Sequence, residues 1–293
     1  MDERYQRLTL FEFADFSKLR EKSALVVGVG GLGATVAEIL VRVGIGRLVI
    51  MDYDTLEMAN MNRMIYKPNQ IGKFKVEALS EYLLEINEQI DIVAHPFNIT
   101  SGDGYKAFMD EVGKSDVIFG CVDTFGVRLF MNAKCVEQKR TFIDGGASLD
   151  GIRGSVQVVI PGKTACYRCH RHTLGLGKEK SEKTVSVKED PMLYLELEEP
   201  GKDRQTGICH LTSLPTTMTI IAALQCQEGF KYLLEFGDVA NYLMYNGIRG
   251  VIERYDWERD PKCPVCGEAK DKLDDEKLRK IEEAAKMFDE MTK

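Results

Sequence analysis

The glycine turn at residues 28–33 constrains the fold of this chain more than any other feature. Its sequence, GVGGLG, follows a short apolar run at residues 24–27, and residues 34–43 are predicted to form a helix. A second apolar run, at residues 47–51, ends at Asp52, nineteen residues after the last glycine of the turn. A strand, a G-x-G-x-x-G turn, a helix and a second strand that ends in an acid are typical of a mononucleotide-binding βαβ unit.

Each part of this unit has a chemical role. Gly28 permits the tight turn, Gly30 lets the backbone approach a phosphate, and Gly33 lets the helix pack close to the strand. The helix N-terminus offers unpaired N–H groups and partial positive charge to an anion. Asp52 can accept hydrogen bonds from ribose hydroxyls. The pattern predicts an adenine nucleotide, although a dehydrogenase would carry the same unit and a glycine turn that binds nothing is the structural alternative.

Charged residues beyond Asp52 favour ATP. A loop that contains Asn62 leads to Arg63, and Lys75 begins an amphipathic segment. Two cations suit a triphosphate and a departing pyrophosphate, whereas a dehydrogenase does not need them; ordinary solvated surface cations are the alternative. Asp123 follows another apolar run, and carboxyl ends of strands face the ligand crevice in open α/β sheets, so Asp123 is a candidate magnesium ligand.

The order of the predicted elements indicates an α/β fold. Further strands are predicted at residues 90–97, 116–121 and 140–143, alternating with helices. From Gly151 the pattern changes to the alternation of antiparallel strands. We therefore expect a Rossmann-like nucleotide-binding sheet, parallel in its N-terminal half and continued by antiparallel strands.

Charge and hydropathy exclude several classes of function. The net charge of −7 argues against binding to nucleic acid or to a membrane surface through bulk charge. The opening sequence, MDERYQRLTLFEF, lacks the pattern of a charged and then apolar leader, and the apolar stretches are too short to span a bilayer. We expect a cytoplasmic protein with neither nucleic acid nor membrane as a partner.

Two Cys-x-x-Cys pairs predict a metal site. Of the eight cysteines, these four are Cys166, Cys169, Cys263 and Cys266. In a cytosolic protein such pairs indicate metal before disulfide, and four thiolates are the ligand set of a closed structural zinc site. Because 93 residues separate the two pairs, the metal would tie a late segment to a middle one rather than form a zinc finger.

Cys209 is a candidate nucleophile. It follows a densely charged segment, residues 171–206, that is predicted to be an exposed crossover, and it lies shortly before a helix predicted to begin at Pro215. A helix N-terminus favours the thiolate, although a lone cysteine beside a helix is also a common small core residue. Core positions are predicted for the other single cysteines: Cys121, Cys135 and Cys226.

Several motifs together resemble the ThiF/MoeB superfamily of adenylating enzymes: GVGGLG, DYDTLEMANMNR, GKFKVEAL, CVDTFGVR, IPGKTACYRC and CPVC. Within it, GICHLTSLPTTMTIIAALQ resembles the catalytic-cysteine segment of ubiquitin-fold-modifier-activating enzymes, which use ATP to activate the C-terminal glycine of a ubiquitin-like protein. The resemblance implies an adenylation domain over residues 1–267, with a crossover loop, 171–214, that carries Cys209. Residues 268–293 are predicted to be a charged helical tail.

The resemblance also implies roles for individual residues. Gly31 and Asp52 would hold phosphate and ribose, and Cys209 would take the modifier from its adenylate as a thioester and pass it to a conjugating enzyme. Arg7, in an N-terminal arm predicted for residues 1–22, would reach the ATP of the partner in a homodimer, and with Arg63 and Asp123 it would serve catalysis. ATP, Mg²⁺ and a structural Zn²⁺ are the implied cofactors. The implied nucleotide-site residues are Gly28, Gly30, Gly31, Gly33, Asp52, Asn62, Arg63, Lys75, Asn98, Asp123 and Thr124.

Three alternatives remain open from the sequence. An adenylyltransferase for a sulfur-carrier protein would share the nucleotide site, the zinc and the dimer but would not pass its cargo along a conjugation chain; Cys209 in its SLPTT context distinguishes the two. A nicotinamide dehydrogenase with a structural zinc would have no use for Arg63, Lys75 and Asp123 around phosphates. An inactive binding module would keep the fold without the chemistry.

Overall fold

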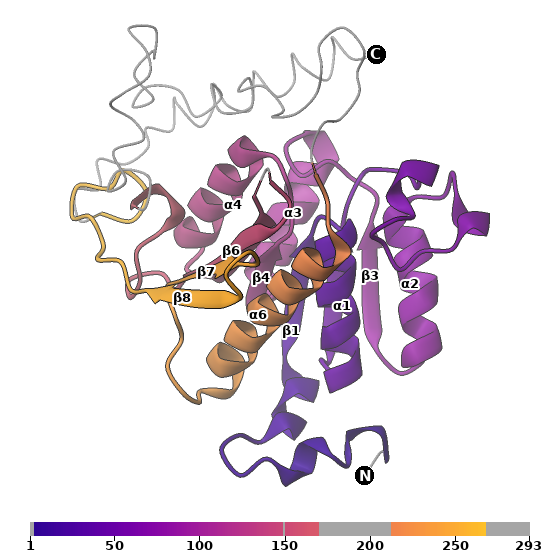
Figure 1. Ribbon diagram of the computed structural model, residues 1–293, viewed down its shortest axis with the longest axis horizontal. Helices are drawn as coiled ribbons and strands as arrows, with labels where there is room; N and C mark the ends of the chain where they lie inside the picture. Colours follow the sequence, from indigo (N-terminus) through magenta and orange to yellow (C-terminus); the bar gives the residue numbers. More distant parts are fainter. Residues whose placement is uncertain (1–2, 149, 170–211, 268–293) are drawn as a thin grey trace, which may run out of the picture.

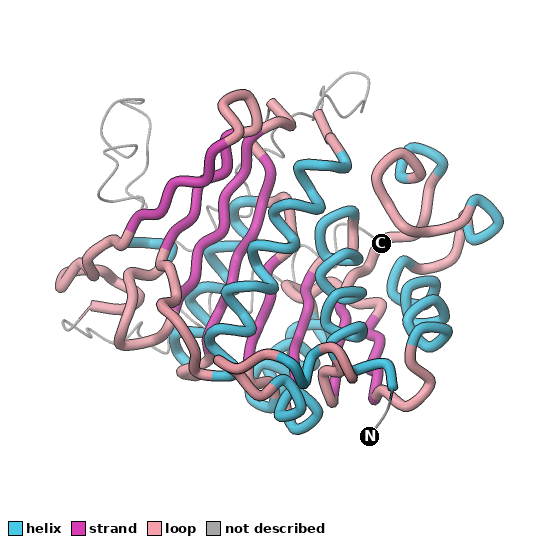
Figure 2. Tube along the Cα trace, turned by 60° about the horizontal axis from the view of Figure 1, so that its bottom comes forward, coloured by secondary structure: helices cyan, strands magenta, loops and turns pink. Residues whose placement is uncertain are grey.

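One mixed sheet organises the molecule. The computed structural model describes residues 3–148, 150–169 and 212–267, and among these residues eight strands form one sheet in the order β3-β2-β1-β4-β5-β6-β7-β8 (Figure 1). The strands lie side by side as a twisted surface (Figure 2). Their bounds are β1 Ser23–Val27, β2 Arg47–Met51, β3 Asp91–His95, β4 Val117–Gly120, β5 Thr141–Ala147, β6 Arg153–Val159, β7 Tyr242–Asn246 and β8 Val251–Tyr255.

The directions of the strands confirm the predicted architecture. The strands from β3 to β5 in this order are parallel, and β5, β6, β7 and β8 pair antiparallel. One boundary differs clearly: the strand predicted at residues 140–143 continues to Ala147, because Gly145 and Gly146 pair with β6. A run of glycines has little strand propensity of its own, so the neighbouring strand decides this extension.

Helices cover both faces of the sheet. Val26 of β1 packs on one face with helices α1, α2 and α6, whereas Leu25 and Val27 pack on the opposite face with α3 and α4. This alternation of side chains along each strand explains why the parallel strands are apolar throughout. The helices are α1 Gly31–Val43, α2 Lys75–Ile86, α3 Gly102–Lys114, α4 Phe125–Glu137 and α6 Pro215–Leu234. None of the described helices is long and apolar enough to cross a membrane.

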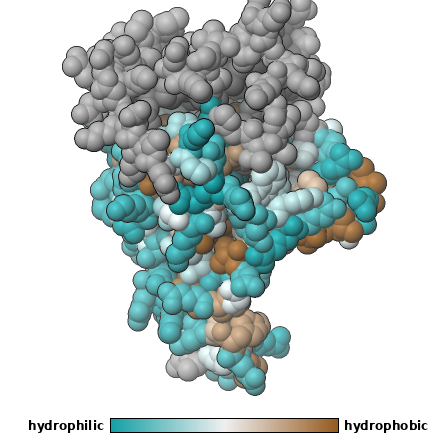
Figure 3. Space-filling view, turned by 90° about the vertical axis from the view of Figure 1, so that its left-hand side faces the viewer, coloured by the Kyte–Doolittle hydropathy of each residue, from teal (hydrophilic) through white to brown (hydrophobic). Residues whose placement is uncertain are grey.

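The N-terminal arm lies at the edge of the sheet where α1 and α2 end, at the bottom of Figure 1. It consists of three 3₁₀-helices: η1 Glu3–Tyr5, η2 Leu8–Leu10 and η3 Phe16–Glu21. The Arg4 guanidinium donates a hydrogen bond to the Ile86 carbonyl oxygen (3.1 Å), at the C-terminus of α2. Apolar atoms appear at the same lower end in Figure 3. Two apolar residues of the arm, Leu10 and Phe13, are exposed.

Candidate nucleotide and metal sites

The glycine turn lies at the point where the order of the sheet reverses. The chain passes from β1 to β2 on one side, whereas β4 pairs with the other side of β1. In open α/β sheets the ligand crevice lies at the carboxyl ends of the two strands beside such a point, here β1 and β4. Gly28 has a φ of +83°, and a Cβ on it would lie 2.7 Å from the Cys121 carbonyl oxygen. Only glycine therefore suits this position, because both the backbone conformation and the neighbouring strand exclude a side chain.

Helix α1 begins three residues earlier than the sequence predicted. Its first residue is Gly31, and its N-cap residue, Gly30, has no side chain that could cap the free N–H groups. A Cβ on Gly33 would collide with the Gly28 carbonyl oxygen, so the first turn of the helix packs directly on the glycine turn. Because no side chain caps this N-terminus, its first N–H groups are suited to an anion such as a phosphate.

A loop after β2 lies against the glycine turn and brings Arg63 to it. The Arg63 carbonyl oxygen is so close that a Cβ on Gly31 would approach it to 2.8 Å. The Tyr66 hydroxyl donates a hydrogen bond to the Val29 carbonyl oxygen (2.6 Å) and anchors the same loop. The Arg63 guanidinium donates to uncharged oxygens of its own loop, the Ala59 carbonyl and the Asn62 side chain (both 2.9 Å). No described carboxylate pairs with this guanidinium within salt-bridge distance, and the Arg63 backbone and Cγ lie against the first residue of α1.

Asp52 and Lys75 form a second charged group beside the glycine turn. The Asp52 carboxylate accepts hydrogen bonds from the Val29 N–H (2.8 Å) and the Asp54 N–H (2.9 Å). Burial raises the pKa of Asp52, and the Lys75 ammonium acts in the opposite direction. Lys75 is buried, and its Nζ lies 2.6 Å from the Asp54 carboxylate. Lys75, which is predicted to bind the triphosphate, is thus already paired with Asp54. A bound phosphate would replace this carboxylate or share the ammonium with it.

The remaining predicted nucleotide residues also follow strands at this edge of the sheet. Asp123 is exposed in the loop between β4 and α4, and the Thr124 hydroxyl donates a hydrogen bond to it (3.3 Å). The Asn98 side chain accepts hydrogen bonds from the N–H and the hydroxyl of Thr100 (2.9 and 2.8 Å), and so shapes the turn after β3. A single exposed carboxylate suits Mg²⁺, which is commonly held by one or two carboxylates together with substrate phosphates.

The described residues bring neither of two predicted catalytic residues to this crevice: one lies elsewhere, and the other falls outside the described part of the chain. Arg7 is exposed and lies in the N-terminal arm, at the opposite edge of the sheet, so it is distant from the nucleotide residues of its own chain. Cys209 and most of the predicted crossover, as well as the predicted tail at 268–293, lie outside the described residues. Arg7 acting across a dimer and Cys209 as nucleophile remain predictions.

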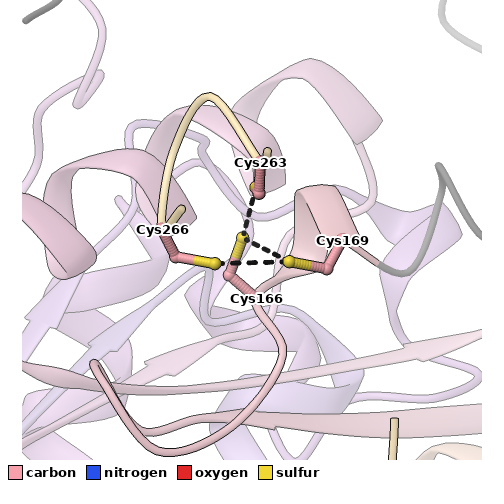
Figure 4. Close-up of side chains that lie close together, drawn as sticks. All are labelled: Cys166, Cys169, Cys263 and Cys266. Atoms are coloured by element: carbon pink, nitrogen blue, oxygen red, sulfur yellow. Dashed lines mark hydrogen bonds between the residues drawn. The ribbon is translucent and has the colours of Figure 1, made fainter. Parts of the chain in front are cut away.

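The two Cys-x-x-Cys pairs come together as predicted. All four sulfur atoms lie within 4.8 Å of one another, and the four side chains point at a common centre (Figure 4). Pairs of sulfur atoms lie 3.2 to 3.9 Å apart. Tetrahedral zinc with Zn–S bonds of about 2.3 Å requires sulfur atoms about 3.8 Å apart. The four buried cysteines therefore fit a closed zinc site: Cys166, Cys169, Cys263 and Cys266.

The four sulfur atoms are close enough to affect one another and a nearby backbone group. The hydrogen bond between Cys166 and Cys169 lowers the pKa of Cys169 and raises the pKa of Cys166. The Asp260 N–H donates a hydrogen bond to the Cys169 sulfur (3.5 Å), as backbone N–H groups do toward thiolates in metal sites. Cysteine sulfur would fill all four coordination positions of the metal, which leaves no open position for a catalytic water.

Comparison with known proteins identifies the family. The sequence matches the ThiF family over residues 2–265. The chain belongs to the ThiF family. It is 37% identical over 256 residues to Ubiquitin-like modifier-activating enzyme 5 of Caenorhabditis elegans, a match that covers 85% of this chain and 56% of the relative. The protein of the same name from Oryza sativa subsp. japonica is 34% identical over 263 residues, covering 86% of this chain and 58% of the relative. This ThiF-family chain thus spans little more than half the length of these relatives.

Solved structures support the ThiF-family fold. A crystal structure of Escherichia coli MccB with ATP superposes with a TM-score of 0.69 over 91% of this chain and 75% of the MccB chain. The sequence identity is 21%. A structure of PaaA, at 18% identity, gives a TM-score of 0.66 and covers 87% of this chain and 82% of that one. At these identities the likeness establishes the fold alone.

Three polar residues whose side chains are mostly buried were not predicted as site residues: Arg128, Asp144 and Gln225. The Arg128 guanidinium donates a hydrogen bond to the Val122 carbonyl oxygen (2.9 Å) and pairs with Asp144 (3.2 Å). The Gln225 side-chain amide donates hydrogen bonds to two carbonyl oxygens, those of Gly120 and Ile143 (3.1 and 3.0 Å). A polar Gln225 within an otherwise apolar stretch of α6 was a signal that could have marked it as a buried hydrogen-bonding residue.

Proposed function

We propose that this chain activates a ubiquitin-like protein with ATP. The C-terminal glycine carboxylate of that protein would attack the α-phosphorus of ATP, forming an acyl-adenylate and releasing pyrophosphate. The Cys209 thiolate would then attack the acyl carbon, forming a thioester and releasing AMP. Transfer of the acyl group to the cysteine of a conjugating enzyme would complete the cycle.

One observation carries this proposal: both cations and the magnesium candidate belong to the crevice that holds the glycine turn. Arg63 lies over the first residue of α1, Lys75 lies beside Asp52, and Asp123 follows β4 at the switch point. Positive charge around a triphosphate stabilises the developing charge of a leaving pyrophosphate. A hydride-transfer enzyme has no need of such an arrangement. The 37% identity to a modifier-activating enzyme supports the same conclusion.

Each residue has a defined task in the adenylation step. The uncapped start of α1 and Arg63 would bind phosphate, and Asp52 would accept hydrogen bonds from the ribose. Asp123 would hold Mg²⁺, which when bound supplies charge neutralisation for the departing pyrophosphate. The first step needs no general base, because the attacking carboxylate is already ionised. Zinc at the four cysteines would hold the segment after β6 to the segment after β8 and take no part in the chemistry.

The partners follow from the same proposal. The substrate is a ubiquitin-like protein with a C-terminal glycine, and the acceptor is a conjugating enzyme. The position of Arg7 at the far edge of its own chain is compatible with action on the nucleotide of a second copy, so we propose a homodimer. Residues 1–267 would form the adenylation domain.

Intact-mass measurement tests this function. The full chain is mixed with ATP, Mg²⁺ and a ubiquitin-fold protein that ends in Gly-Gly. We expect an adduct of the mass of that protein, which thiol treatment removes and which Cys209→Ala abolishes. Cys209→Ser is the matched control, because it should retain an adduct that resists thiols. ATP–pyrophosphate exchange with no adduct would instead support a sulfur-carrier adenylyltransferase. Absence of ATP binding would overturn both.

A further inference from the structure

Arg128 lies directly beneath the loop that carries Asp123. Its Nε donates a hydrogen bond to the Val122 carbonyl oxygen (2.9 Å), immediately before Asp123 in the chain. Its Nη1 lies 3.2 Å from the Asp144 carboxylate, and both side chains are mostly buried, at 14% and 4% exposure. A guanidinium has several donors in a rigid plane, so it can hold a loop carbonyl and a carboxylate at once. Arg128 thereby joins the Asp123 loop to β5.

The Cys166–Cys169 segment contacts the same arginine. Tyr167 lies within this segment and acts on Arg128: burial acts to lower the pKa of Arg128, whereas Asp144 and the Tyr167 side chain raise it. Its ring packs on Phe125, two residues after Asp123, with the ring centroids 5.7 Å apart. The Tyr167 N–H donates a hydrogen bond to the buried Asn132 side chain, further along α4 (3.0 Å). The four-cysteine site therefore rests on α4 at three points, two of which adjoin the Asp123 loop.

The packing around the guanidinium leaves it little freedom. A Cβ on Gly146 would collide with the nitrogen atoms of Arg128, so β5 closes one side of the side chain. Gly146 and Asp144 are alternate residues of β5 and therefore face α4 together. A movement of Tyr167 would have to displace Arg128 and, through it, the Val122 carbonyl.

We propose that Arg128 is a positioning residue that couples the four-cysteine metal site to the Asp123 loop. Metal binding orders the Cys166–Cys169 segment, Tyr167 fixes Arg128, and Arg128 holds the loop in the form that binds Mg²⁺ with ATP. The four-cysteine site thus has a role in nucleotide binding in addition to joining two segments of the chain. The part of this proposal that concerns Mg²⁺ rests on the proposed function, whereas the ordering of residues 121–125 does not.

Hydrogen exchange tests the ordering without any nucleotide. The zinc-loaded chain is compared with Tyr167→Phe, which removes the hydroxyl and keeps the ring, and with Arg128→Lys. We expect amide exchange over residues 121–125 to accelerate about tenfold in both, a coupling typical of one lost polar contact to a charged group. Removing zinc from the wild type should accelerate the same amides, and removing it from Arg128→Lys should add little. Tyr105→Phe is the control, because Tyr105 packs on Phe130 at a different part of α4.

A Mg²⁺ titration of ATP binding tests the consequence. The Mg²⁺ concentration for half-maximal ATP binding should rise about tenfold in Tyr167→Phe and Arg128→Lys and stay at the wild-type value in Tyr105→Phe. If exchange over 121–125 is unchanged both in Tyr167→Phe and after zinc removal, the coupling is wrong. Tyr167→Phe decides this even if Arg128→Lys does not fold. If the wild type binds no ATP, the proposed function is wrong. Hydrogen exchange over residues 121–125 still tests whether the four-cysteine site is coupled to the Asp123 loop, because it needs no nucleotide.

Discussion

The backbone of Arg63 lies over Gly31 at the first turn of α1, where a Cβ on Gly31 would come within 2.8 Å of the Arg63 carbonyl oxygen and 3.3 Å of its Cγ. Two segments more than thirty residues apart therefore meet at the first turn of α1. In the proposed function, helix N–H groups from one segment and the Arg63 guanidinium from the other would bind phosphate together. The contact requires glycine, so it explains the second glycine of the Gly30-Gly31 pair, which the G-x-G-x-x-G pattern does not.

Gly31→Ala should weaken ATP binding about tenfold or more with a smaller effect on folding. The added methyl group forces the backbone of the Arg63 loop outward and shifts the guanidinium, and small misplacements of positioning groups are costly. ATP affinity is measured by calorimetry and stability by urea unfolding. Gly113→Ala is the control: it lies in helix α3, where the nearest contact is the end of the Gln138 side chain at 3.1 Å. Equal ATP affinity in both variants would contradict the proposed role of this contact.

Lys75→Ala should reduce ATP affinity by about tenfold or more, because a buried ammonium beside Asp52 is lost. Lys73 offers a matched control on the same segment. Its Nζ also pairs with an acid, Glu81 (2.7 Å), but both side chains are about half exposed, and such surface pairs contribute little. Lys73→Ala should therefore bind ATP as the wild type does. Similar losses of ATP affinity in both variants would indicate a general effect of charge rather than direct binding of the triphosphate by Lys75.

Cys169→Ser should abolish metal binding and destabilise the chain. Purified wild type should contain about one zinc ion per chain by elemental analysis, in keeping with a closed four-sulfur site. Loss of a cross-link that closes a loop of nearly one hundred residues should lower the free energy of unfolding by about 5 kcal/mol on a chain-entropy estimate. Cys135→Ala is the control, since Cys135 is equally buried but lies on α4 and is not one of the four clustered cysteines. A variant Cys169→Ser that still holds a full equivalent of zinc would refute the site.

Asp144 should make stability depend on pH in an unusual direction. Burial raises its pKa from the ordinary value of 3.8 to about 6, although Arg128 opposes the rise. Between pH 4 and pH 6 the folded state then holds a proton that the unfolded state releases, so the stability contributed by Asp144 increases as the pH falls. A shift of about two units corresponds to roughly 3 kcal/mol.

Asp144→Asn isolates this effect, because asparagine does not titrate. The free energy of unfolding of the wild type minus that of Asp144→Asn, measured by urea titration, should rise from pH 7 to pH 4. If the ion pair with Arg128 dominates instead, the pKa is held low and the same difference falls toward acidic pH. The sign of the slope therefore shows whether burial or pairing controls this carboxyl group.

The sequence by itself determined the elements whose chemistry is local. The glycine turn at 28–33, the strand that ends at Asp52 and the change from parallel to antiparallel pairing after residue 151 were all predictable, because each depends on neighbouring residues and on short periodicities. The convergence of the two cysteine pairs was also predictable, since their spacing is that of a metal site. Even here the start of α1 was misplaced by three residues, because Gly31 and Gly33 are poor helix formers, and their close packing on the Arg63 loop, Gly28 and Cys121 is tertiary.

Only the tertiary structure decided how distant segments share a site. The pairing of Lys75 with Asp54, the contact of Arg63 with Gly31 and the position of Arg7 at the opposite edge of the sheet follow from how loops cross, which no local pattern encodes. The same holds for Arg128 and Asp144, which are sixteen residues apart and meet because α4 packs over β5. A buried ion pair is stable only where three-dimensional packing supplies both partners and excludes water, and the sequence records the residues but not their approach.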